Sequence, residues 1–584
     1  MRSAWILLVL FLLALTVRLA YLSDRRDYEF NDRLELDPRA YDERAAAILR
    51  GEDPTGGRPD YQAPLYPYFL AAVYRVAGRD YDAARAVQAL LGALTVVWTA
   101  VIGGRLFRPS TGRIAGLVAA LYAPFPFYEA QIMKSGPALF LVLLGCFLLL
   151  RFRSPVSALL AGVALGGGAL LRENTLLFLA AAAAGEAWGR SAGRGSLRRG
   201  ALVLLGGAIA VAPVTLRNHA RSGDWILITS QGGQNFYIGN NPAARGTYTD
   251  LPFVRPDPRW EEEDFRAEAF RRIGRELPPA ALSRYWYGEA FRWMAREPAR
   301  AAALWGRKAL LFWNRLELPD NENFYYMRER FAALRVLPFT FGVIAPFALL
   351  GMAIAVRRFR RLFLLYAGVG VVFAALVAFF LFSRYRLGAV PFLILFAAHG
   401  GERFVGAWRE RRFGAAALLT AGLLTAAALV HLVRPIDFDP RRDGYLPLHV
   451  NRAMLFAEQG QGERAAEEYA AALEIAPDRA EIRKRMGAVL ARLGRREEAI
   501  REMQRAAAGL PADGGLRNDL ALLLLAGGEQ EKALVLFREA VRVEPGLEAP
   551  HRNLARLLEE RGEAEEAARE MRIADSLRTA RGGR

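Results

Sequence analysis

The sequence predicts an all-α protein that joins a polytopic helical membrane domain of about eleven spans to a C-terminal α-solenoid of about four repeats. Three observations support this fold class. The 584-residue chain is 53% hydrophobic and yet 24% charged, which suits neither a uniform membrane bundle nor an ordinary soluble domain. Long apolar runs alternate with arginine-rich loops as far as residue 434. A 34-residue period then follows.

The positive charge lies between apolar runs and does not gather on one soluble segment. Lys and Arg number 78 against 60 Asp and Glu, which gives a formal net charge of +18. Because much of this surplus lies in short loops, membrane topology explains it better than nucleic-acid binding does. The single cysteine, Cys146, cannot form an intramolecular disulfide, and the five histidines have no metal-ligand spacing. We therefore expect no nucleic-acid partner, disulfide framework or zinc site.

The predicted membrane domain, residues 1–434, begins with an apolar run over 5–22. This run can cross a bilayer, whose hydrocarbon core needs roughly 20 apolar residues. No small-residue cleavage site follows it, so we expect an uncleaved first span and not a signal peptide. The further spans are predicted at 86–107, 113–130, 137–152, 156–171, 174–188, 200–216, 337–356, 362–382, 387–400 and 413–434.

Basic residues mark one side of the membrane, because short cytoplasmic loops collect Lys and Arg. They cluster in alternate loops, at 105–113, 151–153, 190–199, 357–361 and 403–412. With a cytoplasmic N-terminus, the outward loops are 23–85, 124–136, 172–173, 217–336 and 383–386. The two long ones are expected to hold juxtamembrane helices on the periplasmic side. The odd span count places the repeats on the extracytoplasmic side of the inner (plasma) membrane.

A 34-residue repeat follows a predicted connector at 435–445. It is marked by Pro477, Pro511 and Pro545, and by Gly460, Gly494, Gly528 and Gly562. The period and pattern are those of tetratricopeptide repeats, in which helix-turn-helix units stack on their neighbours. The repeat domain is predicted at 446–580, with a tail at 581–584. The usual early tryptophan is replaced by His449, Arg483, Arg517 and His551. The charged helix surfaces can be solvated faces, or a concave face can bind a peptide.

Charged residues gather at the predicted outward ends of the spans. They are Asp37, Asp42, Glu129, Lys134, Arg172, Glu173, Arg217, Arg384 and Arg386. Such residues can line a site at the membrane surface. A transporter would be expected to show polar or interrupted spans in two matching halves, and the sequence has no such duplication.

Several segments together carry a resemblance to a known family. They are LDPRAYDERAAAILRGE at 36–52, YQAPLYPYFLAAVYRVAG at 61–78, LLRENTLLF at 170–178, RNHARSGDWILITSQGGQNFYIGNNPAARGTY at 217–248 and SRYRLGAVPFLILFAA at 383–398. In this order they resemble polyprenyl-phosphate-dependent membrane glycosyltransferases, which include the protein O-mannosyltransferases and the aminoarabinose transferase. The resemblance extends over residues 5–405 and implies a polyprenyl-phosphate sugar donor.

The resemblance places Asp37 on the family's catalytic aspartate, the general base that takes the acceptor's proton. Pro38 stands where the family often has a second acid, so Asp42 is the alternative base if the helix register differs. Glu129 lies where many relatives have another acidic residue. It can orient an acceptor or a metal, or it can pair with Lys134.

Cations can stabilise the departing phosphate, and guanidinium can bind phosphate bidentately. The candidates are Lys134, Arg172, Arg217, Arg384 and Arg386. Each can instead touch lipid headgroups. Sugar or acceptor contacts are predicted for Tyr41, Tyr237, Asn240 and Asn241. The last three belong to a Gly- and Asn-rich segment that is expected to form turns, for which a structural role is also open.

The predicted function is transfer of a sugar from a polyprenyl-phosphate donor to an extracytoplasmic acceptor, which can be a protein, a lipid or a glycan. The repeats would recruit or orient that acceptor, and membrane lipid is the other expected partner. The sequence requires no cofactor and leaves a divalent metal open. Two alternatives stay open: a catalytically silent membrane scaffold that presents the repeats, and a lipid or polysaccharide transporter.

Overall fold

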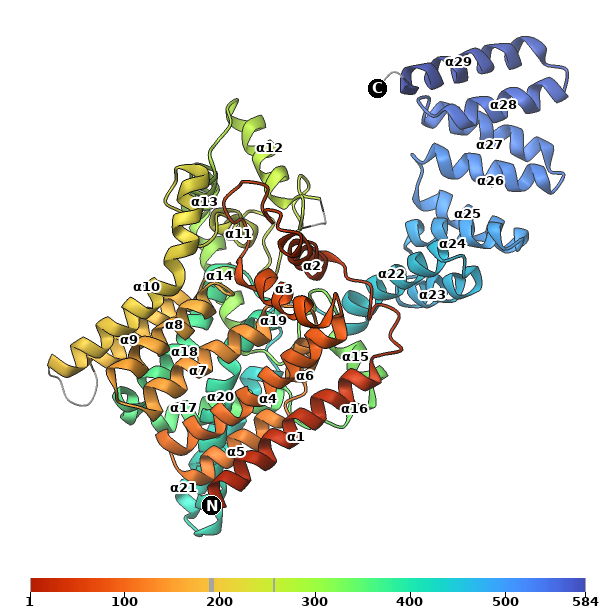
Figure 1. The fold of residues 1–584 in the computed structure, drawn as a ribbon. Coiled ribbons are helices and arrows are strands. Elements are labelled where there is room, and N and C mark those ends of the chain that lie inside the picture. Colours follow the sequence, from red (N-terminus) through yellow and green to blue (C-terminus); the bar gives the residue numbers. More distant parts are fainter. Residues whose placement is uncertain (1, 189–193, 256–257, 583–584) are drawn as a thin grey trace. The chain divides into compact units, whose positions relative to one another are not determined.

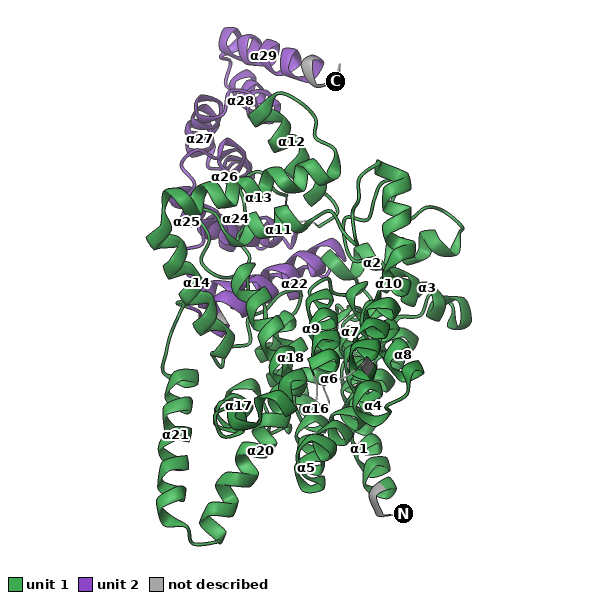
Figure 2. Cartoon of the chain, turned by 90° about the vertical axis from the view of Figure 1, so that its left-hand side faces the viewer, with its two compact units in different colours: residues 1–437 green, residues 438–584 purple. Residues whose placement is uncertain are grey.

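The computed structural model describes residues 2–188, 194–255 and 258–582, and within these ranges the regular elements are helices (Figure 1). An isolated bridge joins Tyr122 to Phe339. The chain divides into two compact units, Met1–Asp437 and Phe438–Arg584 (Figure 2). The predicted all-α fold class is confirmed.

Among the described residues, five helical stretches are long and apolar enough to cross a membrane. They are α1 (Arg2–Asp24), α4 (Tyr81–Leu106), α10 (Arg194–Ser222), the stretch Phe341–Ala378 that holds α17 (Phe341–Ala355) and α18 (Phe359–Ala378), and α21 (Phe413–His431). Three shorter apolar helices are α7 (Ser135–Arg151), α8 (Pro155–Ala169) and α9 (Thr175–Trp188). The first unit is therefore a polytopic membrane domain, and the count of about eleven spans stays a prediction.

The prediction of one continuous span at 113–130 is wrong. The structure divides this stretch into α5 (Pro109–Ala120) and α6 (Pro124–Glu129). The proline that opens α6 cannot donate to the preceding turn, and its ring excludes a continuous helix. The amide of Ala123 donates instead to the main-chain oxygen of Phe339 at 2.9 Å. The 12 residues of α5 extend about 18 Å, less than the hydrocarbon core of about 30 Å.

Close backbone contact between α8 and α10 explains the glycines in these helices. A Cβ atom on Gly162 would lie 2.1 Å from the main-chain oxygen of Val203. One on Gly206 would lie equally close to the main-chain oxygen of Leu159. Small residues allow membrane helices to approach in this way, so these glycines are required for packing.

Several helices of the two long loops gather at the end of the first unit opposite the N-terminus (Figure 1). The loop helices are α2 (Leu36–Leu49), α3 (Leu65–Ala77), α11 (Gly232–Gly239), α12 (Glu261–Ile273), α13 (Pro279–Arg296), α14 (Pro298–Trp313), α15 (Phe324–Arg330) and α16 (Ala332–Arg335). A cluster around the fully buried Trp286 packs α11, α12 and α13 against the segment that follows α18. The loop 383–386 forms the short helix α19 (Ser383–Arg386) ahead of α20 (Val390–Arg409).

The Gly- and Asn-rich segment forms the predicted turn only at its end, where the amide of Ala244 donates to the main-chain oxygen of Asn241 at 3.0 Å. Its first part is the helix α11, and Asn240 and Asn241 follow the helix. A Cβ atom on Gly233 would lie 1.8 Å from the main-chain oxygen of Ser283, so α11 lies directly against α13. The glycines serve this close approach, which the sequence pattern alone does not distinguish from a turn.

The second unit consists of four helix pairs. They are α22 (Leu446–Glu458) with α23 (Gly462–Ile475), α24 (Ala480–Arg492) with α25 (Arg496–Gly509), α26 (Gly514–Ala526) with α27 (Gln530–Val543), and α28 (Glu548–Glu560) with α29 (Ala564–Gly582). Gly460, Gly494, Gly528 and Gly562 have φ values from 74° to 82°, as the turn within each pair requires. The predicted repeat solenoid is confirmed.

Polar side-chain contacts stand where tetratricopeptide repeats usually have an early tryptophan. His449 contacts Glu468 at 2.6 Å and His551 contacts Glu570 at 2.5 Å, each on the second helix of its own pair. Arg483 makes the corresponding contact with Glu502. A side-chain pair therefore joins the two helices of these repeats in place of aromatic packing.

Candidate active site

Two adjoining cavities lie among the loop helices and the ends of the membrane helices. The first, which we term the polar cavity, has about 340 Å³ and is lined by residues that include Asp37, Tyr41, Glu261, Asp320 and Arg384. The second, termed the apolar cavity, has about 370 Å³ and is lined by Lys134, Arg172 and Glu173 with many apolar side chains, among them Leu176 of α9 and Leu376 of α18. The cavities adjoin, because their walls share Lys134, Gln231, Asn235, Phe380 and Tyr385.

Asp37 lies in the first turn of α2, at the wall of the polar cavity. Arg384 Nη2 donates to Asp37 Oδ2 at 3.1 Å and lies 2.7 Å from Asp320 Oδ2, so two carboxylates share one guanidinium. Leu36, directly before Asp37, has a φ of 51°, which is uncommon for a residue with a side chain. The chain is thus strained where it presents Asp37, a feature that often marks functional sites.

Lys134 and Arg172 carry positive charge that no described acidic side chain balances at ion-pair distance. Arg172 Nη2 donates to Ser135 Oγ at 2.7 Å, and its guanidinium lies 4.8 Å from the centre of the Tyr385 ring. Lys134 Nζ lies 5.9 Å from the centre of the Tyr41 ring. Burial lowers the pKa of Lys134, and burial with the nearby Arg384 lowers the pKa of Arg172. Glu173 lines the same cavity and offsets part of this charge from beyond ion-pair distance. Two cations without an ion-pair partner in one cavity wall suit an anionic ligand.

Arg217 and Arg386 do not line either cavity. Arg217 pairs with Asp60 and donates to the hydroxyl of Tyr68 at 2.7 Å. Arg386 donates to main-chain oxygens of the segment after α14, including that of Asn314 at 2.6 Å. These predicted phosphate ligands are engaged in structural contacts that the sequence does not reveal.

Asp42 and Glu129 also have partners of their own. The Asp42 carboxylate accepts from the hydroxyls of Tyr74 and Tyr81 and pairs with Arg79. Glu129 is held by Arg18, whose Nε lies 2.6 Å from Oε2, and not by Lys134. Neither acid lines the two cavities. The structure therefore brings only Asp37 of the predicted acids to the cavity that holds Arg384.

Of the four residues predicted to contact a sugar or the acceptor, one lines a cavity and three do not. Tyr41 is buried at the wall of the polar cavity. Tyr237 packs on Trp286, with ring centres 4.8 Å apart. Asn240 accepts from Lys308 Nζ at 3.0 Å and donates to two main-chain oxygens. Asn241 likewise bonds to main-chain groups near it. These last three side chains hold the fold around α11 and lie outside the cavity walls.

Sequence reasoning missed three acids of the polar cavity, Asp250, Glu261 and Asp320. Asp320 lies in the PDNEN stretch before α15, and Glu261 opens α12 within the acidic run EEED. Burial raises the pKa of Asp320. Burial, with a smaller effect of Asp37, raises the pKa of Glu261 to about 7. The only signal in the sequence was their place in an outward loop, which many solvated acids share.

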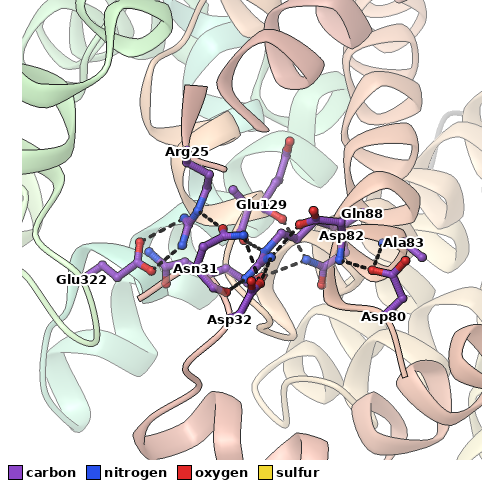
Figure 3. A network of polar contacts seen from close by, with 12 residues as sticks. Arg25, Asn31, Asp32, Asp80, Asp82, Ala83, Gln88, Glu129 and Glu322 are labelled. Atoms are coloured by element: carbon purple, nitrogen blue, oxygen red, sulfur yellow. Dashed lines mark hydrogen bonds and ion pairs between the residues drawn. The ribbon is translucent and has the colours of Figure 1, made fainter. Parts of the chain in front are cut away.

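A buried polar network joins the segment before α2 to the turn that carries Asp320 (Figure 3). Arg25 Nη1 and Nη2 donate to the carboxylate of Glu322 at 3.2 and 2.9 Å. Arg25 Nε donates to Asn31 Oδ1 at 3.0 Å, and Arg85 donates to the main-chain oxygen of Asn31. Two chain segments far apart in sequence are thereby fixed near the site.

The described residues contain no group of three or more His, Cys, Asp or Glu side chains that could hold a metal ion. In the polar cavity, Asp37 and Asp320 both contact Arg384, whose single positive charge can balance one of the two carboxylates. No step of the chemistry below depends on a divalent cation.

The fold and the cavities thus define a helical membrane protein with Asp37 and two cations that have no ion-pair partner beside an apolar space. The family model described as dolichyl-phosphate-mannose-protein mannosyltransferase matches residues 61–216. This match confirms the resemblance inferred from the sequence and supports a membrane glycosyltransferase activity of the mannosyltransferase kind. A search of curated proteins found no match.

Solved structures of MamA are similar to part of the chain. One, described as the crystal structure of MamA, has 17% identity, covers 31% of this chain and 97% of that chain, and has a TM-score of 0.24. Another, MamA 41-end from Desulfovibrio magneticus RS-1, has 20% identity, covers 30% of this chain and 92% of that chain, and has a TM-score of 0.23. The repeat architecture rests on the helix pairs of the present structure and not on these similarities.

Proposed function

We propose that this protein transfers a sugar from a polyprenyl-phosphate donor to a hydroxyl group of an acceptor, with Asp37 as the general base. The observation that carries the proposal is the pair of adjoining cavities. The apolar cavity suits the first units of a polyprenyl chain, and Lys134 and Arg172 in its wall suit the phosphate. The polar cavity beside it holds Asp37 and suits the sugar and the acceptor.

In the proposed step, Asp37 accepts the proton of the acceptor hydroxyl while the acceptor oxygen forms a bond to the anomeric carbon. The bond from that carbon to the phosphate oxygen breaks, and its electron pair leaves with the phosphate. Lys134 and Arg172 stabilise the negative charge that develops on the polyprenyl phosphate. Arg384 is already engaged by two carboxylates, so we assign it to the positioning of Asp37 and not to the phosphate.

The name of the matching family suggests mannose as the sugar and a protein as the acceptor. We place the reaction on the extracytoplasmic side of the inner membrane, where the basic-loop pattern puts both long loops and the repeats. The repeat unit, which is compact by itself, would recruit or orient the acceptor.

The alternative of a catalytically silent scaffold predicts a dry, filled space around Asp37. The polar cavity of about 340 Å³ beside this residue supports the enzyme instead. A transporter is less well supported, because the charged side chains at these cavities come from loops and the ends of spans and not from matching halves.

The test is a transfer assay with purified full-length protein. Polyprenyl-phosphate mannose is supplied as donor with a threonine-containing peptide or a methyl glycoside as acceptor, followed by other polyprenyl-phosphate sugars. We expect release of polyprenyl phosphate together with formation of an equal amount of glycosylated acceptor. Binding of the donors without turnover of any of them would favour the scaffold.

A further inference from the structure

Glu261 lies in the wall of the polar cavity and has two hydroxyl partners. Tyr61 donates to its Oε1 at 2.7 Å, and Tyr248 donates to its Oε2 at 3.4 Å. The nearby Arg255 pairs with Glu263 and Asp264 and not with Glu261. Among the described residues, no Lys, Arg or His lies at ion-pair distance from Glu261.

A carboxylate in this setting has unused capacity for hydrogen bonds. An ionised carboxylate offers about four lone-pair sites, and the two tyrosines use one on each oxygen. Burial without a counter-charge is costly and raises the pKa of Glu261 to about 7. If the side chain served only to accept from two hydroxyls, a neutral glutamine could do so without the cost of a buried, unpaired negative charge. Glu261 itself lines the cavity that holds Asp37.

The wall near Glu261 also has an aromatic face. The rings of Tyr248 and Phe382 are stacked with their centres 6.2 Å apart, and Phe380 meets Tyr248 edge-on at 5.5 Å. All three side chains line the polar cavity. A sugar ring presents hydroxyl donors at its edge and C–H groups on its faces. The carboxylate of Glu261 can accept from the hydroxyls, and the aromatic rings can pack against the C–H groups.

We propose that Glu261, framed by Tyr61 and Tyr248, is the part of the polar cavity that binds the hydroxyl groups of a sugar-like substrate. This inference rests on the proposed function and adds to it a specific binding residue. The ring it holds can be that of the donor sugar or that of a glycoside acceptor, because both present the same hydroxyl chemistry. Glu261 binds by accepting hydrogen bonds, whereas Asp37 takes the proton.

The test compares Glu261→Gln with Glu262→Gln and the wild type. Glu262 is the next residue of α12 and is engaged with Arg266 at 2.6 Å, so its variant controls for the loss of one negative charge at this helix. Steady-state transfer is measured with polyprenyl-phosphate mannose as donor and methyl mannoside as acceptor, each varied in turn.

We expect Glu261→Gln to raise the KM of one substrate by about 10-fold or more, since hydrogen bonds to charged groups are the strong ones. The kcat should stay within about twofold, because Gln keeps the shape and Asp37 is untouched. A raised KM for donor assigns the subsite to the donor sugar, and a raised KM for acceptor assigns it to the acceptor. Tyr248→Phe, which removes one hydroxyl, should raise the same KM and replaces Glu261→Gln if that variant fails to fold.

The outcomes separate this inference from the proposed function. If the wild type transfers sugar and both KM values of Glu261→Gln equal those of Glu262→Gln, the subsite is wrong and the proposed function stands. If the wild type transfers nothing from any donor, the proposed function fails and the subsite fails with it.

Discussion

Removing the ammonium of Lys134 should weaken binding of polyprenyl phosphate without destabilising the protein. No described acidic group lies at ion-pair distance from Lys134, and burial lowers the pKa of its ammonium. The buried charge is therefore unfavourable in the ligand-free protein, and Lys134→Met removes it. In the complex, a hydrogen bond to a charged group contributes about 1.5–3 kcal/mol. The dissociation constant should therefore rise about 10- to 150-fold.

Arg217 provides the matched control, because it was predicted for the same role and lies elsewhere. It pairs with Asp60 and donates to Tyr68, and it lines neither cavity. Arg217→Gln should change the affinity less than about twofold, within the range expected for a residue that does not touch the ligand. Arg172→Gln should behave like Lys134→Met.

The assay is calorimetric titration of a short-chain polyprenyl phosphate into each purified variant in detergent. This ligand is the proposed product, so no turnover interferes. Thermal unfolding of the variants, followed by tryptophan fluorescence, checks that they are folded. The reasoning is refuted if Lys134→Met binds as tightly as the wild type while Arg217→Gln binds weakly.

Three further outcomes are expected. Arg25→Met leaves the carboxylate of Glu322 without its bidentate partner, so the free energy of unfolding in detergent should fall by about 3 kcal/mol. The double variant Arg25→Met with Glu322→Gln should recover part of that loss. Removal of the repeat unit should leave transfer to a small glycoside intact and reduce modification of the physiological acceptor; loss of both would mean that the repeats complete the active site. After Cys146→Ser, exposed cysteines introduced by Arg275→Cys and Gln530→Cys should both react with an impermeant thiol reagent in intact cells, and protection of either one would contradict the proposed topology.

The fold was predictable where the signal is local and periodic. The helix pairs of the repeats follow from glycine and proline at a fixed spacing, because each residue acts on the turn or helix end in which it lies. The apolar runs predict membrane helices for a similar reason. The division at Pro124 was missed because the surrounding composition stays apolar while the helix ends.

The site was predictable only in part, because side-chain partners depend on tertiary structure. The family resemblance singled out Asp37, and the outward pattern of charged residues singled out Arg384. The fold brings Asp37 Oδ2 and Arg384 Nη2 to 3.1 Å across 347 positions of sequence. The outward pattern of charged residues also selected Arg217, whose partner Asp60 lies 157 positions away in the sequence and could not be foreseen. Glu261 could not be singled out, because it opens an acidic run that is typical of the solvated start of a helix. In the structure, however, Glu261 lines the polar cavity.

The central claim is that Asp37 accepts the acceptor's proton, and the direct measurement is the transfer rate of Asp37→Asn beside Asp42→Asn. The amide keeps the shape of the side chain and cannot take the proton, so turnover should fall by at least about 100-fold while polyprenyl phosphate still binds. Asp42→Asn should retain more than a tenth of the wild-type rate, since Asp42 contacts Tyr74, Arg79 and Tyr81 away from the cavity. Near-normal turnover by Asp37→Asn, with loss of turnover in Asp42→Asn, would contradict the assignment of the base.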